Sequence, residues 1–133
     1  NIALRVMTVS PDIKAAALFA SMSGDELKNA GLLHNISLDP IFQTELDTSP
    51  TVLERISPLY YYNNITAPIQ LHHGAVDQVV PVAWAEETCN VLTTASVQIE
   101  CIYYPEEDHT FRSRVADQLY GALFGFYEMY LSP

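Results

Sequence analysis

Basic residues are scarce in this sequence. Lys and Arg together number 6 against 16 Asp and Glu, which gives a formal net charge of −10 over 133 residues. A field of that sign repels polyphosphates, so we expect no nucleic-acid partner. Long apolar runs are missing as well: none approaches the length needed to cross a bilayer, and we expect no membrane partner.

Cysteine is almost absent. Cys89 and Cys101 are too few to form a disulfide framework. Cys101 alternates with Val97, Ile99 and Tyr103, which predicts that it packs within a strand as a small apolar residue. Two triplets have the form of N-glycosylation sequons, about the number that chance allows. These observations leave the compartment open, with a cytoplasmic location favoured.

The residues that are present describe one globular domain. Apolar residues make up 49% and charged residues 17% of the chain, and 133 residues can bury a sizeable core. Three segments rich in strand-forming residues, 13–21, 67–73 and 97–105, alternate with helical segments. Such alternation predicts parallel pairing through right-handed crossovers. We therefore predict an α/β fold with a parallel sheet of about three strands and flanking helices.

Helical periodicity marks the segments around the strands. Residues 1–10 carry Ile2, Val6 and Val9 at helical spacing, and the helix is expected to end before Pro11. Residues 81–95 begin at a proline, which is favoured in the first turn of a helix. The expected core-facing residues of the last helix, 112–131, share one face: Val115, Leu119, Leu123, Phe126 and Tyr130.

Residues 24–58 differ in texture from the rest, with scattered glycines and prolines and only short helical pieces. We predict that they form a lid-like insertion between two strands of a single domain that spans 1–133. Segment 13–21 is a short, continuous apolar run, which predicts a strand covered on both faces. Of the three consecutive tyrosines at 60–62, we expect one to be buried and two to be partly exposed.

Two loops leave the carboxyl ends of predicted strands with chemically useful residues. The sequence HGAVDQVVP follows the second strand and carries Asp77, and PEEDHTF follows the third and carries His109. Parallel sheets place their ligands beyond this edge, so the two side chains are predicted to meet. A carboxylate against an imidazole fixes the tautomer and orients the ring for general-base catalysis.

Simpler interpretations of these residues stay open. Asp77 could be an aspartate whose sole role is to form a turn, and His109 could be a surface histidine in an acidic loop. A metal site would have to gather His72 or His73 with them, but adjacent residues of a strand point to opposite faces, which disfavours such a site. Three acids, 106–108, directly precede His109, and we expect their charge to favour a protonated ring.

The two loops together resemble a known family. SPLYYYNNITAPIQLHHGAVDQVVP followed by IECIYYPEEDHTF is similar to the C-terminal half of an α/β-hydrolase of the prolyl-oligopeptidase (peptidase S9) type and its dienelactone-hydrolase-like relatives. In that family H-G-x-x-D-x-x-V-P holds the triad acid and Y-P-x-x-x-H-x-F holds the triad base. The resemblance covers essentially the whole chain. It implies Asp77 as acid, His109 as base, a peptide or small ester substrate, and no cofactor or metal.

The family's nucleophile motif G-x-S-x-G is absent from the 133 residues. Ser23 comes closest, but it has no glycine two residues before it and Asp25 follows two residues after it. We expect the chain alone to be inactive, with the serine on a missing N-terminal half. The apolar segment 13–21 would pair with that half, or with a second copy of the chain. The alternative is a non-catalytic, truncated α/β interaction module.

Overall fold

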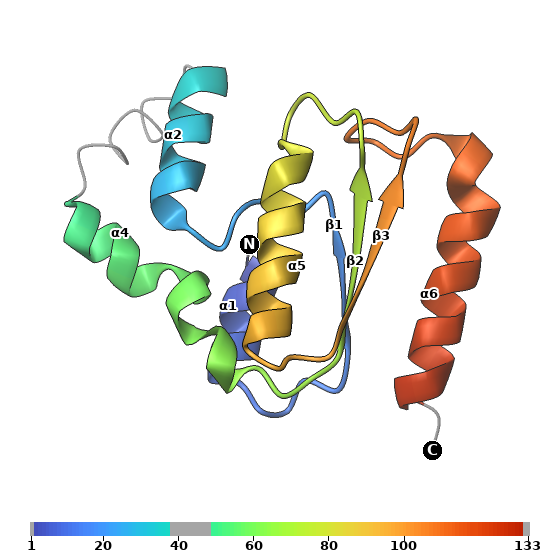
Figure 1. Ribbon diagram of the computed structural model, residues 1–133, viewed down its shortest axis with the longest axis horizontal. Coiled ribbons are helices and arrows are strands. Elements are labelled where there is room, and N and C mark those ends of the chain that lie inside the picture. Colours follow the sequence, from blue (N-terminus) through green and yellow to red (C-terminus); the bar gives the residue numbers. More distant parts are fainter. Residues whose placement is uncertain (1, 38–48, 132–133) are drawn as a thin grey trace.

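The computed structural model describes residues 2–37 and 49–131 (Figure 1). Its sheet has three parallel strands in the order β1 (Ala16–Phe19), β2 (Ile69–Gly74) and β3 (Ile99–Tyr104). Ile69 pairs with Ala16 on one side and with Ile99 on the other. The predicted α/β fold with three parallel strands is confirmed, although β1 is shorter than segment 13–21.

Helices surround this sheet. The α-helices are α1 (Ile2–Val9), α2 (Glu26–Ile36), α4 (Pro50–Ile56), α5 (Val82–Thr94) and α6 (Ala116–Leu131), and the 3₁₀ helices are η1 (Pro58–Asn64) and η2 (Ser113–Val115). Helix α6 lies on the opposite side of the sheet from α5 (Figure 1). None of the helices in the described ranges is long and apolar enough to span a membrane.

Strand β2 is the centre of the molecule. All six of its residues are buried, because it has a strand on each side and helices over both faces. Its Leu71 packs in one apolar cluster with Leu4 of α1, Tyr62 of η1 and Leu92 of α5. Tyr62 is buried, whereas Tyr60 and Tyr61 are 55% and 43% exposed, as predicted for the tyrosine triplet.

Part of the predicted lid-like insertion, residues 38–48, lies outside the described residues. On either side of that gap, α2 and α4 contact each other. Asp25 caps α2 by accepting the Leu27 N–H through its side chain, and Ser57 donates its hydroxyl to the Leu53 carbonyl at the end of α4. The role of this segment as a lid stays a prediction.

Two helices show how far periodicity carries. In α6 the predicted face is confirmed: Phe126 is buried, and Leu119, Leu123 and Tyr130 are half-buried, as is Val115 at the end of η2. In α1 the helix is confirmed, but the apolar stripe that marks it in the sequence is not the side that is buried. Ile2, Val6 and Val9 are 80%, 40% and 81% exposed, whereas Leu4 and Met7 are buried. Both stripes of α1 are apolar, and contact with the core decides between them.

Two expectations about segment 13–21 and Cys101 are also corrected. Phe19 of β1 is 43% exposed, so this strand is not covered on both faces by the residues described. Cys101 of β3 does not pack as a free apolar side chain, because it forms a disulfide with Cys89 of α5. The bond ties that helix to the sheet. Disulfides are typical of oxidising compartments, and the favoured cytoplasmic location stays a prediction.

Candidate active site

The carboxyl ends of β2 and β3 open into two neighbouring loops (Figure 1). We call residues 74–81, after β2, the acid loop and residues 105–112, after β3, the base loop. The ladder pairs Gly74 with Tyr104 at the last position of both strands, so the loops begin side by side. This register follows from parallel pairing, and it is what brings residues 32 positions apart into contact.

The two loops bring Asp77 and His109 together. Nδ1 of His109 lies 2.9 Å from Oδ2 of Asp77, a hydrogen-bonding distance. The Asp77 side chain is fully buried and that of His109 is 39% exposed. One nitrogen of the imidazole is thus fixed by a carboxylate, while part of the ring stays exposed to solvent. This arrangement suits a general base that must contact a group from another segment or a substrate.

The acid loop holds its own carboxylate in place. Oδ1 of Asp77 accepts the backbone N–H of Val79 at 2.8 Å and that of Val80 at 2.9 Å. Burial opposes the ionised carboxylate, but the hydrogen bonds from Val80, His109 and Val79 outweigh it and lower the pKa of Asp77. Asp77 is therefore ionised at neutral pH, with Oδ2 left to face the histidine.

Two buried histidines, His72 and His73, lie near the end of β2, and one of them contacts the acid loop. His73 donates from Nε2 to the Val80 carbonyl at 3.1 Å, and the same nitrogen lies 3.5 Å from Oδ2 of Asp77. His72 points elsewhere: its ring nitrogens bond the Tyr104 hydroxyl and the Gln70 side-chain oxygen, both at 2.9 Å. Burial lowers the pKa of His72 to about 4, so its ring is neutral.

His72 and His73 have different partners, as expected for adjacent strand residues that point to opposite faces. Among the residues described, no three or more His, Cys, Asp or Glu side chains form a group that could hold a metal. The support that His73 gives to the acid loop was not predicted from the sequence. The only available signal was its position four residues before Asp77.

The base loop contains the three acids that precede His109, and each of them is bonded to Arg112 or Arg114. Glu106 pairs with Arg114 at 3.1 Å, and Asp108 accepts the Thr110 backbone N–H at 2.9 Å and pairs with Arg112 at 2.9 Å. The Thr110 hydroxyl and N–H and the Arg112 guanidinium lower the pKa of Asp108. Glu107 bonds to arginine donors. The carboxylate on the His109 ring is therefore that of Asp77.

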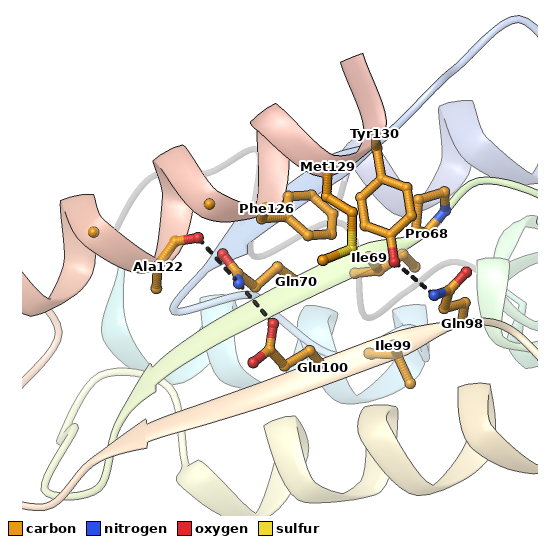
Figure 2. Close-up of a pocket in the computed structure, with 12 residues that line it drawn as sticks. Pro68, Ile69, Gln70, Gln98, Ile99, Glu100, Ala122, Phe126, Met129 and Tyr130 are labelled. Atoms are coloured by element: carbon orange, nitrogen blue, oxygen red, sulfur yellow. Dashed lines mark hydrogen bonds between the residues drawn. The ribbon is translucent and has the colours of Figure 1, made fainter. Parts of the chain in front are cut away.

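A separate hollow of about 360 Å³ lies between α6 and the sheet. It is lined by Pro68, Gln70, Glu100, Phe126 and Tyr130, among others (Figure 2). These residues lie toward the amino ends of β2 and β3, away from the edge where Asp77 meets His109. In Figure 2, the amide of Gln70 points between Glu100 and the Ala122 carbonyl of α6, and it bonds to both.

Comparisons with solved structures place this arrangement in a known fold. A puromycin-hydrolysing peptidase of Mycobacterium tuberculosis matches with a TM-score of 0.80 and 22% identity, over 97% of this chain and 20% of its own. The acylaminoacyl peptidase of Pyrococcus horikoshii matches with a TM-score of 0.76 and 19% identity, over 96% and 22%. An esterase of Pyrococcus furiosus matches with a TM-score of 0.68 and 16% identity, over 98% and 50%.

The chain thus spans about a fifth of the length of those peptidases and half of the length of that esterase. No curated protein sequence matches it. The model of the prolyl oligopeptidase family matches residues 34–133, which include both the acid loop and the base loop. This match covers well over half of the sequence: the chain belongs to the prolyl oligopeptidase family.

Proposed function

We propose that this chain carries the acid and the base of a serine hydrolase that cleaves peptide or carboxylic ester bonds. The nucleophilic serine would come from a segment outside these 133 residues. One observation carries the proposal, the 2.9 Å contact between Nδ1 of His109 and Oδ2 of Asp77 at the carboxyl edge of the sheet. Membership of the prolyl oligopeptidase family supports it.

In this mechanism Asp77 accepts a hydrogen bond from the Nδ1–H of His109 and so fixes the tautomer that leaves the lone pair of Nε2 available. Nε2 takes the serine proton as the serine oxygen attacks the substrate carbonyl carbon. The imidazolium, stabilised by Asp77, then gives that proton to the leaving amine or alcohol. Water hydrolyses the acyl-enzyme through the same base. In each step a proton moves to or from Nε2 of His109.

The segment that supplies the serine needs a place to bind, and β1 offers one. Within the described ranges β1 pairs only with β2, and its Phe19 is 43% exposed. An unpaired strand edge is a template for another strand. We therefore propose that the complementary segment, in the same polypeptide or in a separate one, adds its strand along β1. Self-association of two copies through β1 is the alternative outcome.

A fluorophosphonate probe, which reacts with activated serines, tests where the nucleophile lies. We expect no labelling of the 133-residue chain alone, because loss of the nucleophile costs on the order of 10⁶ in turnover. The chain joined to its complementary segment should be labelled, on a serine of that segment. Labelling of a serine within the 133 residues would overturn this assignment.

The non-catalytic interaction module makes the opposite prediction for the complete protein. Substitution of Asp77 would then leave any hydrolytic activity unchanged, whereas a Ser-His-Asp mechanism loses most of it. Inhibition by a chelator, reversed by added metal, would instead indicate a metal-dependent hydrolase.

A further inference from the structure

Glu107 is the one acid of the base loop that is fully buried. The proposed mechanism gives it no role, since it does not contact the His109 ring. Its carboxylate nevertheless has strong partners. Oε2 accepts the backbone N–H of Arg112 at 2.6 Å, and Oε1 accepts the Nε–H of Arg114 at 2.5 Å. A carboxylate that bonds a main-chain donor and a guanidinium is a strong anchor.

The position of these partners in the sequence matters. Glu107 precedes His109, and Arg112 and Arg114 follow it. The Glu107 carboxylate therefore closes the base loop on itself, with the histidine inside the closed segment. The Arg114 side chain and the Arg112 N–H lower the pKa of Glu107, so the carboxylate stays ionised and keeps both partners.

The main chain of Glu107 joins the base loop to the acid loop. Its carbonyl accepts the N–H of Val76, next to Asp77, at 3.1 Å, and its own N–H bonds the Tyr104 carbonyl at 3.2 Å. The backbones approach closely here, because a Cβ on Gly74 would lie 2.3 Å from the Glu107 carbonyl oxygen. Residue 107 thus contacts both loops and the end of β3.

The loop also has a backbone that needs such support. Phe111 has φ of 50°, a left-handed conformation that a bulky residue rarely adopts. Its ring lies edge-on to Tyr104 and to Phe19, with centroids at 5.5 and 6.2 Å. A strained residue two positions after His109 persists only where its surroundings fix it, and Glu107 bonds the next residue.

We propose that Glu107 is the positioning residue of the proposed base: its carboxylate holds the loop in the conformation that aims His109 at Asp77. This inference rests on the proposed function. It assigns no contact with substrate. Such contacts can govern turnover, because a displacement of a catalytic group by about 1 Å can lower the rate about 100-fold.

The test uses the complete protein and compares Glu107→Gln with Glu106→Gln. Both variants remove one negative charge that faces Arg114, but the Glu106 side chain is 80% exposed and Glu107 is fully buried. We expect Glu107→Gln to lower kcat by about 10- to 100-fold with little change in KM. Glu106→Gln should change kcat by less than about threefold, as exposed pairs contribute little.

The labelling kinetics of a fluorophosphonate probe separate positioning from folding. A positioning role lowers the rate constant of labelling, while the labelled fraction stays near that of the unaltered protein. A merely structural role lowers the labelled fraction and leaves the rate constant of the remaining molecules unchanged. That second result, or equal effects of the two variants, would overturn the inference.

If Glu107→Gln fails to fold, Arg114→Lys tests the positioning role of Glu107 instead. It keeps the charge opposite Glu107 at a side chain that is 46% exposed, but loses the planar guanidinium. We expect a lower labelling rate constant, and an unchanged one would overturn the inference. Asp77→Asn serves as the reference: if it leaves kcat intact, the proposed function fails. If Asp77→Asn abolishes turnover and Glu107→Gln leaves it unchanged, only the role of Glu107 fails.

Discussion

The acid loop and the base loop meet at one edge of the sheet but are held in different ways. The acid loop is compact, and its carboxylate is fixed by the two backbone N–H groups that follow it, those of Val79 and Val80. The base loop depends on side chains, namely Glu107 with its arginine partners, and contains the strained Phe111. The Asp77 carboxylate is thus held by its nearest neighbours in the chain, whereas the base loop is held mainly by side-chain contacts between its two ends.

Substitution of the acid tests the pair itself and should have the largest effect. In the complete protein, Asp77→Asn keeps the size of the side chain but presents an amide to Nδ1 of His109, which favours the wrong tautomer. We expect kcat to fall by about 10⁴-fold. Steady-state kinetics measure it, with Asp117→Asn, an exposed position in the first turn of α6, as the control. A change within about tenfold would contradict the role of Asp77.

Gly74→Ala should push the two loops apart. The new Cβ would lie 2.3 Å from the Glu107 carbonyl oxygen and 2.5 Å from that of Asp108, and backbone atoms can yield only by moving the base loop. We expect a loss of about 100-fold in kcat and of about 1–3 kcal/mol in the free energy of unfolding. Kinetics and urea unfolding measure the two effects.

The matched control for that variant is Gly121→Ala in α6. A Cβ there meets nothing within 4 Å, and alanine is favoured over glycine in a helix by up to about 1 kcal/mol. This variant should therefore be equally or more stable and fully active. If Gly74→Ala behaved like it, the close approach of the two loops would not matter to either property.

The buried His72 of β2 predicts a pH dependence of stability. Folding lowers the pKa of His72 to about 4, whereas the unfolded chain binds this proton near pH 6.5. Between these values the unfolded state holds more protons, so the free energy of unfolding falls as pH decreases from 6.5 to 4, by up to about 3 kcal/mol. Urea unfolding across this range should show a shallower pH dependence in His72→Gln. Parallel curves would contradict the prediction.

A smaller effect is expected for the disulfide, which lies away from both loops. Replacement of Cys89 and Cys101 by serine opens a link between residues 12 positions apart. We expect the free energy of unfolding to fall by about 2 kcal/mol, mainly because the unfolded chain gains freedom. Turnover per folded molecule should stay the same, because the pairing of β2 with β3 still fixes where the two loops begin. A large loss of turnover would show that the bond helps to position them.

Much of the site could be predicted from the sequence because its signals are local. A buried strand followed by HGAVDQVVP, and a second one followed by PEEDHTF, indicate which loops leave the same edge of a parallel sheet. The contact between Asp77 and His109 follows from that geometry. The anchoring by Glu107 did not follow, because three consecutive acids look alike in a sequence. Only its burial and its bond to the Arg112 main chain distinguish Glu107 from the other two.

The sequence by itself determined the alternation of strands and helices, the core-facing residues of α6 and the pair of loops at the carboxyl edge, because these depend on periodicity and on the rules of parallel pairing. The tertiary structure decided three further features: the buried stripe of α1, the disulfide partner of Cys101 and the burial of Glu107 against its arginine partners. Each of these depends on what lies opposite a side chain in space. Contacts with residues from distant parts of the chain produce no periodic pattern in the sequence around a side chain.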